Sequence, residues 1–245
     1  MPEVATPGKV GVVFVSHSAR IADGLVELAR QMAPTSTLVA AGGTEDGRIG
    51  TSFDLVSAGI AEADAGDGVV VLCDLGSAIL TAETALDFLD DDVLARVRIV
   101  DAPLVEGGVA AAVAAEAGDP LDQVVSAAES ARGGTSAGAG GDSGTSAASV
   151  SPAAEDGGGT STVQRTVTLV NADGLHARPA AELVKLASRF PQRVTVNGTD
   201  AKSLLGIMSL GLTKGATVDI VSDDPAGREA VDAIATLAES GFGEA

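Results

Sequence analysis

The stretch VGVVFVSHSAR, residues 10–20, decides the fold of the first half of the chain. Its first six residues are a continuous apolar and largely β-branched run, which is typical of a strand buried on both faces of a sheet. The polar segment SHS follows directly, and it contains His17, one of only two histidines in the 245 residues. Because ligands of open α/β sheets bind beyond the carboxyl ends of the strands, this histidine is predicted to lie at a functional edge.

Outward from this strand, apolar runs and helical patterns alternate along the chain. Strands are predicted at 10–15, 37–42, 68–74 and within 96–105, and helices at 24–32, 53–63, 77–89, from Val109 and near Pro120. Such alternation predicts a mostly parallel α/β sheet. Three strand ends, in VSHS, AAGGTEDG and CDLGSA, are then expected to meet at one edge.

A segment of different composition separates this region from the rest of the chain. Residues 131–162 read ARGGTSAGAGGDSGTSAASVSPAAEDGGGTST, with almost no large apolar side chain. Such a segment cannot bury enough surface to offset its ordering entropy, so we predict a flexible linker between domains at 1–130 and 163–245. A coil of this type would span roughly 30 Å, which lets one domain sweep over the other.

The last 83 residues predict a different architecture. Strands are expected at 162–170, 192–198, 199–202 and 216–222, and helices at 175–190, 203–212 and 226–240. The order β-α-β-β-α-β-α predicts an α+β open-faced sandwich, with helices on one side of an antiparallel sheet.

The composition excludes several classes of function. Aromatic residues make up 2% of the chain, with no Trp or Tyr, and the net charge is −19, so neither base stacking nor binding to a nucleic-acid backbone is favoured. A single Cys excludes an intrachain disulfide and is typical of a reducing compartment. No apolar run reaches roughly 18 residues and no signal pattern opens the chain. We therefore expect a cytoplasmic protein that does not insert into membranes.

The polar residues at the strand ends suit covalent chemistry at His17. Ser16 and Ser18 flank it, residues 40–47 form a Gly-rich turn whose N–H groups could hold an anion, and residues 74–77 add a carboxylate before a helix N-terminus. Together they resemble a nucleophile, an orienting carboxylate and an anion cradle. A Ser nucleophile with His as base stays open, although no G-x-S-x-G elbow is present, and so does a polar loop residue without a catalytic role. A metal site is disfavoured because no ligand cluster surrounds the histidine.

The second histidine, His176, lies just before a predicted helix with Arg178 two residues on. A phosphoryl group there would meet free backbone N–H groups and a guanidinium. Neutral imidazole is a suitable nucleophile, and a hydrogen bond can fix its second nitrogen. A histidine that only caps the helix is the alternative.

The second domain resembles the histidine-containing phosphocarrier family, HPr, of the phosphoenolpyruvate phosphotransferase system. The motifs NADGLHARPA and AKSLLGIMSL carry the resemblance at the right separation. It implies that His176 is phosphorylated and that Arg178 neutralises the phosphoryl group, with Asn171 and Pro179 in the same site. Ser203 matches the serine that some bacteria phosphorylate for regulation, and a simple helix cap is the alternative.

The first domain resembles the mannose-type enzyme IIA family and, within it, the DhaM-type phosphotransferase subunits of phosphoenolpyruvate-dependent dihydroxyacetone kinases. VSHSARIADG, AAGGTEDGRIGTS, DLGSAILTAETAL and APLVEGGVAA carry this resemblance over nearly all of residues 10–115. It implies that His17 accepts the phosphoryl group and that Asp74 orients it. The resemblance places four further residues in the phosphate pocket: Ser18, Gly43, Gly76 and Ser77.

Together the two resemblances imply a phosphoryl relay. Enzyme I, charged by phosphoenolpyruvate, would phosphorylate His176, and the group would pass to His17 in the same chain or a partner subunit. It would then reach ADP on the nucleotide-binding subunit of the kinase and finally dihydroxyacetone on its substrate-binding subunit. The chain itself is expected to bind no cofactor or metal and to form a homodimer. Because it ends at Ala245, without the enzyme I-like segment of some members, a separate enzyme I is expected.

Two rival functions stay open. One is a mannose-type enzyme IIA that feeds a sugar permease, although SHSAR, LGSA and APLVEG favour the dihydroxyacetone branch. The other is a regulatory adapter whose phosphorylation only switches binding to another protein. Neither the route between subunits nor the phosphorylated imidazole nitrogen is decided by the sequence.

Three other features have modest interpretations. Cys73 is expected to fill apolar space within a strand, and residues 90–92, all Asp, to form a solvated turn. Ile207 and Met208 belong either to an apolar docking patch beside His176 or to the core.

Overall fold

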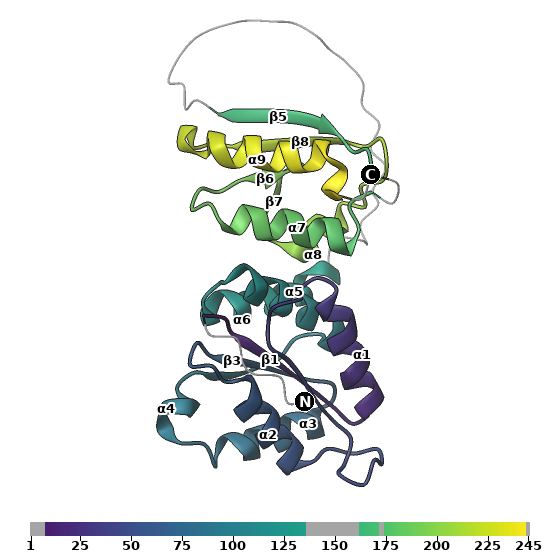
Figure 1. The fold of residues 1–245 in the computed structure, drawn as a ribbon, viewed down its shortest axis with the longest axis vertical. Coiled ribbons are helices and arrows are strands. Elements are labelled where there is room, and N and C mark those ends of the chain that lie inside the picture. The colour runs from purple at the N-terminus through teal and green to yellow at the C-terminus, as the bar shows by residue number, and fades with distance from the viewer. Residues whose placement is uncertain (1–7, 136–161, 172–173, 244–245) are drawn as a thin grey trace, which may run out of the picture.

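A computed structural model describes residues 8–135, 162–171 and 174–243 of the chain. It has two domains, each built around its own four-stranded sheet (Figure 1). Most of the predicted linker, residues 136–161, lies outside the described residues, and the 3₁₀ helix η1 (Ser130–Thr135) ends the first domain.

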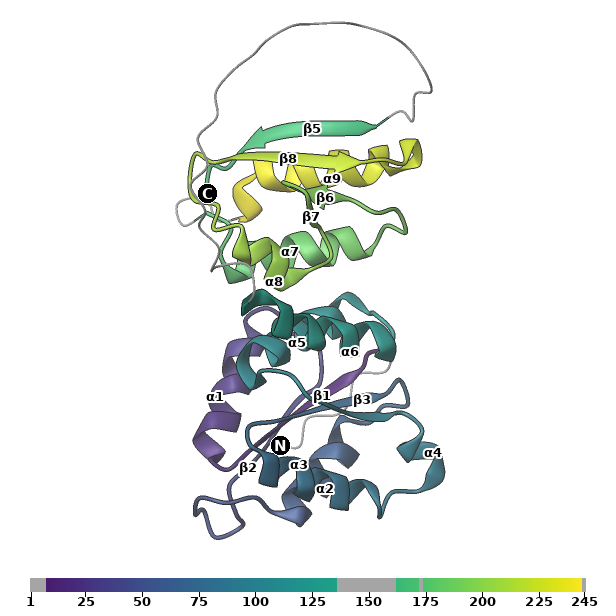
Figure 2. The same cartoon turned by 180° about the vertical axis from the view of Figure 1, so that it is seen from behind.

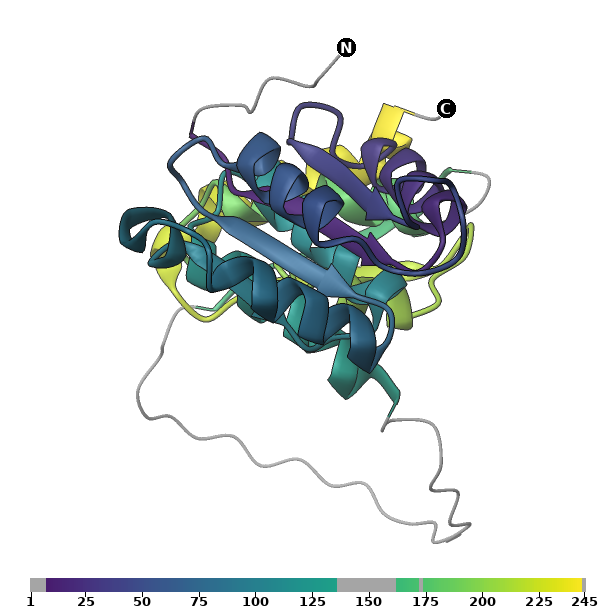
Figure 3. The same cartoon turned by 90° about the horizontal axis from the view of Figure 1, so that it is seen from below.

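The sheet of the first domain is entirely parallel, which confirms the predicted class. Its strand order is β2-β1-β3-β4, and the strand arrows run side by side in one direction in Figure 3. Every residue of β1 is buried, as the continuous apolar run predicts. The strands are β1 (Gly11–Ser16), β2 (Leu38–Gly42), β3 (Val69–Cys73) and β4 (Val97–Val100).

Helices cover both faces of this sheet. Phe14 points to a core shared with α1, α5 and α6, whereas Val13 and Val15 point to a core shared with α2 and α3. The helices are α1 (Ala19–Arg30), α2 (Phe53–Ala63), α3 (Gly76–Leu86), α5 (Leu104–Ala117) and α6 (Leu121–Glu129), with a short α4 (Asp91–Leu94) before β4.

Two predictions in this domain need correction. The helix expected from Val109 begins at Leu104. Gly107 and Gly108 weaken a helix locally and hid its first turn, but packing requires a glycine here, because a Cβ on Gly108 would lie 2.4 Å from the Phe14 ring. The expected solvated turn at 90–92 is the start of α4, with Asp90 as its N-cap. Carboxylates at a helix N-terminus are stabilised by the positive end of the helix dipole.

The second domain has the predicted element order, and its sheet is antiparallel with the order β5-β8-β6-β7. The helices lie on one face of the sheet, which confirms the open-faced sandwich (Figure 1). The elements are β5 (Val163–Thr168), α7 (Ala177–Ser188), β6 (Thr195–Val196), β7 (Thr199–Asp200), α8 (Leu204–Ser209), β8 (Thr217–Ser222), η2 (Pro225–Gly227), α9 (Arg228–Glu239) and η3 (Gly241–Gly243).

The two domains meet through helices. In the second domain, α7 and α8 contact α5 and η1 of the first, and Figure 2 shows them on the side of the first domain that carries α5 and α6. Val109 and Val113 of α5 belong to the same apolar cluster as the core of the second domain. Across the part of the chain that the structure describes, every helix is too short or too polar to cross a bilayer.

Candidate functional site

His17 follows the last residue of β1, at the carboxyl edge of the parallel sheet. Ser16, which ends the strand, is fully buried and accepts a backbone hydrogen bond from Gly43 at 3.0 Å. The carbonyl of His17 accepts from the N–H of Gly50 at 2.9 Å, and the N–H of Asp74 donates to Val15 at 3.1 Å. The ends of β1, β2 and β3 therefore meet here, as predicted.

The carboxylate of Asp74 holds both the backbone and the ring of His17. Its Oδ2 accepts hydrogen bonds from the Ser16 hydroxyl and from the His17 N–H, each at 2.9 Å. Its Oδ1 lies 2.9 Å from His17 Nδ1, and the opposite ring nitrogen, Nε2, lies 2.8 Å from the hydroxyl oxygen of Ser77. The imidazole is thus fixed at both nitrogens.

The charge of Asp74 determines the tautomer of this ring. Burial works to raise the pKa of the Asp74 carboxyl, but the hydrogen bonds from His17 and Ser16 outweigh it and hold the pKa below its ordinary value. An ionised carboxylate only accepts hydrogen bonds, so Nδ1 of the neutral His17 ring carries the proton. Nε2 then presents its lone pair and accepts from Ser77.

The start of α3 adds groups that suit an anion. Gly76 and Ser77 are its first two residues, and the first N–H groups of a helix have no acceptor within the helix. Gly43 adopts a φ of +77°, and its N–H donates to the carbonyl of Ser16, so this N–H is already used within the loop. The N–H of Ser18 is likewise used, because it donates to the Ser16 hydroxyl at 3.1 Å.

His176 is the N-cap residue of α7 in the second domain, and its carbonyl accepts from the N–H of Ala180 at 2.9 Å. The turn before it is held by Asn171, which is buried and donates from its side chain to the carbonyl of Gly174 at 2.5 Å. Gly174 has a φ of +69°, and a Cβ there would lie 2.3 Å from the carbonyl oxygen of Leu212. Asn171 and Gly174 therefore set the backbone that presents His176.

Arg178 and Pro179 occupy the first turn of α7. Arg178 is exposed, and Pro179 is buried where the absence of an N–H costs no helical hydrogen bond. The second predicted site thus combines an imidazole, a helix N-terminus and a nearby guanidinium in one turn.

The second motif, AKSLLGIMSL, has mainly structural contacts. The hydroxyl of Ser203 caps α8 by accepting from the N–H of Gly206 at 3.2 Å, so the cap alternative describes its present contact. Ile207 is fully buried and Met208 packs against the same core, which favours core packing over a docking patch.

Known families match both halves of the chain. The model of the PTS system fructose IIA component matches residues 11–125, and that of the PTS HPr component phosphorylation site matches residues 163–240. PEP-dependent dihydroxyacetone kinase 2, phosphoryl donor subunit DhaM, of Listeria innocua is 45% identical over 105 residues, which cover 42% of this chain and 84% of that protein. The chain belongs to the DhaM family.

Relatives of the whole chain and of the second domain agree with this membership. The PEP-dependent dihydroxyacetone kinase, phosphoryl donor subunit DhaM, of Klebsiella michiganensis is 37% identical over 243 residues, covering 96% of this chain and 51% of that protein. Phosphocarrier protein HPr of Cupriavidus necator is 43% identical over 86 residues, covering 34% of this chain and 97% of that protein. The chain spans about half the length of the DhaM relatives that it matches over both domains.

One contact in this DhaM-family site was missed by sequence reasoning. Ser16 is noted in the sequence only as a neighbouring hydroxyl, yet it is buried and donates to Asp74. The available signal is its position: a hydroxyl that ends an otherwise apolar buried strand needs a hydrogen-bond partner, because an unpaired buried polar group is costly.

Cys73, next to Asp74, should be unreactive in the native protein. Burial first, and then the nearby charges of Asp74 and Glu83, raise the pKa of its thiol to about 12. At pH 8 its thiolate fraction is then on the order of a thousandfold below that of an ordinary thiol. We expect iodoacetamide at pH 8 to leave the native protein unmodified and to alkylate it fully in concentrated urea, as measured by mass spectrometry. Complete native labelling within minutes would contradict this environment.

Proposed function

We propose that this DhaM-family chain is a phosphoryl-relay subunit of a phosphoenolpyruvate-dependent dihydroxyacetone kinase. Enzyme I, charged by phosphoenolpyruvate, phosphorylates His176, and the group passes to His17. From there it goes to ADP on the nucleotide-binding subunit of the kinase, and the resulting ATP phosphorylates dihydroxyacetone. The observation that carries this proposal is the His17 ring held between the Asp74 carboxylate and the Ser77 hydroxyl.

We infer that Nε2 of His17 accepts the phosphoryl group, and the contact between Nδ1 and Asp74 supports this. With the proton kept on Nδ1, the lone pair of Nε2 attacks phosphorus, the new N–P bond forms, and the electron pair of the breaking bond returns to the donor nitrogen. The ring gains positive character, which the Asp74 carboxylate 2.9 Å from Nδ1 stabilises. The Ser77 hydroxyl can then turn to donate to a phosphoryl oxygen, beside the N-terminus of α3.

His176 serves as the upstream carrier in this scheme. Its position at the N-cap of α7 exposes a bound phosphoryl group to the first N–H groups of the helix, and Arg178 supplies a positive charge in the same turn. Asn171 acts one step away, by holding the turn that ends at Gly174. Little covalent chemistry is needed from the protein, because phosphoryl transfer depends mainly on positioning and charge stabilisation.

The proposed partners follow from the same scheme. They are enzyme I and the nucleotide-binding and substrate-binding subunits of the kinase, with ADP or ATP bound by the kinase and none by this chain. A homodimeric assembly and a cytoplasmic location belong to the proposal as well. The DhaM relatives of Klebsiella michiganensis and Listeria innocua are phosphoryl donor subunits of dihydroxyacetone kinases, which supports the kinase as the recipient.

Labelled phosphoenolpyruvate with enzyme I tests the relay directly. Wild type should carry label on both histidines, His17→Ala only on His176, and His176→Ala on neither, because the upstream acceptor is gone. Label should leave the wild type only when the kinase subunits, ADP and dihydroxyacetone are present. Full kinase activity in His17→Ala would overturn the relay. Label that drains to a sugar permease component instead would assign the chain to the mannose-type rival.

A further inference from the structure

The second domain rests on a defined face of the first. Val109 and Val113 of α5 pack into its apolar cluster, and Met32, which follows α1, joins them. Ala110 of α5 is only 3% exposed and lines a cavity between the domains. From the second domain, Val184 of α7 faces the same cavity. This face, formed by α5 and η1, is called the docking face below.

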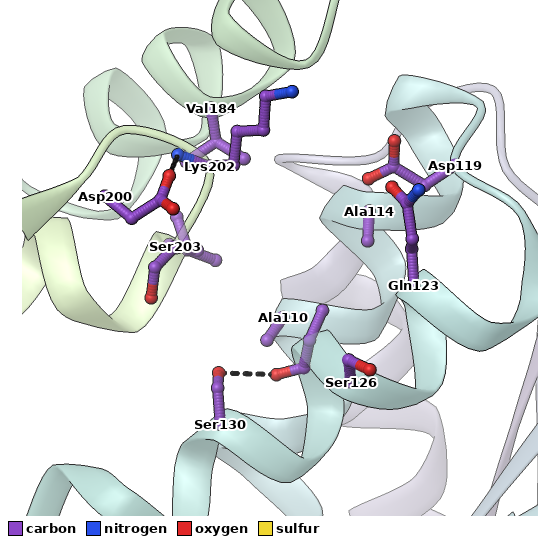
Figure 4. Close-up of a pocket in the computed structure, with 12 residues that line it drawn as sticks. Ala110, Ala114, Asp119, Gln123, Ser126, Ser130, Val184, Asp200, Lys202 and Ser203 are labelled. Carbon is purple, nitrogen blue, oxygen red and sulfur yellow. Dashed lines mark hydrogen bonds between the residues drawn. The ribbon is translucent and has the colours of Figure 1, made fainter. Parts of the chain in front are cut away.

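Polar groups surround the cavity at the edge of this contact. Figure 4 shows side chains of the first domain opposite side chains of the second, with an open space between them. Burial raises the pKa of the Asp119 carboxyl, and the positive charge of Lys202 partly offsets this rise. The two side chains therefore interact electrostatically across the domain boundary. The polar residues that line the cavity are Asp119, Gln123, Ser126 and Ser130 from the first domain, and Asp200, Lys202 and Ser203 from the second.

The His17 site belongs to a different part of the first domain. Its ring contacts Asp74, which follows β3, and Ser77, which starts α3. Helix α3 lies with α2 on the sheet face opposite to α5, as the two separate cores show. Figure 1 accordingly shows the second domain beyond α5 and α6, with α2 and α3 on the far side of the sheet.

This arrangement conflicts with direct transfer between the two histidines of one chain. A nucleophile must come within about 3–3.5 Å of the atom that it attacks. The second domain makes its main contacts with α5 and η1, whereas Ser77 beside the His17 ring belongs to α3. Transfer within the chain is therefore expected to require release of the docked domain.

We propose that the docking face is a binding site for the second domain of the same chain, and that docking withholds His176 from His17 of that chain. The inference rests on the proposed function, since it concerns the relay between these two residues. Because both domains are in one chain, their effective concentration is on the order of mM, so even a weak interface can be occupied and still release. Undocking is then a separate step that precedes transfer within the chain.

Opening the docking face tests the first half of the proposal. Ala110→Arg places a long charged side chain in the contact, and the matched control Ala61→Arg places one on the exposed side of α2. We expect Ala110→Arg to increase the radius of gyration in small-angle scattering and to speed transfer from His176 to His17 several-fold, with no change in the control. Circular dichroism verifies that both variants are folded. A folded Ala110→Arg protein with unchanged size and transfer rate would overturn the proposal.

Locking the domains tests the second half. Gln123→Cys with Lys202→Cys places thiols on the two sides of the cavity, where a short bis-maleimide can join them while Cys73, with a pKa of about 12, stays unreactive. The chain is charged at His176, cross-linked, and mixed with excess chains that carry both His→Ala changes, so that only transfer within a chain is counted. We expect label to stay on His176 after cross-linking and to reach His17 without it.

Each result of the locking experiment has a distinct meaning. Transfer that is as fast in the locked chain as in the unlocked one would overturn the withholding role. Failure of the cross-link to form in the folded protein would overturn docking itself. If wild type carries no label on His176, the proposed function fails, and the cross-link yield and scattering still report whether the domains dock.

Discussion

Asp74→Asn is expected to slow phosphoryl transfer through His17 about ten-thousandfold while leaving the protein folded. The carboxylate accepts four hydrogen bonds, from the Ser16 hydroxyl, from Nδ1 of His17 and from the backbone N–H groups of His17 and Leu75. An amide has a single acceptor oxygen and can offer an N–H to Nδ1 instead. The ring would then carry its proton on Nε2, which removes the lone pair that attacks phosphorus; a triad Asp→Asn change elsewhere shows an effect of this size by the same tautomer change.

The measurement is single-turnover transfer from His176 to His17, followed by rapid quench. Asp87→Asn is the matched control, because that carboxylate is exposed at the C-terminal end of α3 and should leave the rate unchanged. Nitrogen NMR of His17 supplies a readout that lost stability alone would not produce: the proton should move from Nδ1 to Nε2 in Asp74→Asn. A rate within tenfold of wild type, with the tautomer unchanged, would refute the role given to Asp74.

Gly11→Ala should destabilise the first domain by about 2–3 kcal/mol, the upper part of the range expected for overpacking a tight core. Gly11 starts β1, and a Cβ there would lie 2.3 Å from the carbonyl oxygen and 2.8 Å from the Cβ of Ala63 at the end of α2. These atoms belong to the backbone or are fixed to it, so the strand and the helix must separate to admit the methyl group. The same change at Gly24 is the matched control.

Gly24 is exposed within α1, and a Cβ there meets nothing within 4 Å. Gly24→Ala should therefore stabilise the protein by about 0.5–1 kcal/mol, the ordinary cost of a helical glycine. Urea unfolding followed by pulse alkylation of Cys73 measures the first domain alone, because this buried thiol is the only Cys in the chain. If Gly11→Ala leaves the stability unchanged or raises it as Gly24→Ala does, then β1 and α2 are not packed as described.

Much of the fold could be read from local patterns. The buried run at 10–15 and its alternation with helical segments predicted the parallel sheet, because apolar residues recur along the sequence with the period of the strand or helix that buries them. The element order of the second domain followed from the same periods. The N-terminal part of α5 did not, since Gly107 and Gly108 weaken a helix locally and are explained only by the close approach of Phe14 and Ala102.

The candidate site divides in the same way. That His17, Asp74 and Ser77 should share one edge followed from the sequence, because the carboxyl ends of parallel strands lie together. The contacts among them required the tertiary structure: the ring, the carboxylate and the Ser16 hydroxyl come from segments nearly 60 residues apart, and their distances determine which nitrogen keeps the proton. The docking face likewise has no local signature. An Ala-rich helix that is buried by its own sheet has the same sequence pattern as one that a second domain also covers.

Sequence by itself determined the elements and the chemical groups, because these depend on short-range periodicity and residue type. Only the tertiary structure decided the tautomer of His17 and the face on which the second domain rests, because both depend on contacts between residues far apart in the chain.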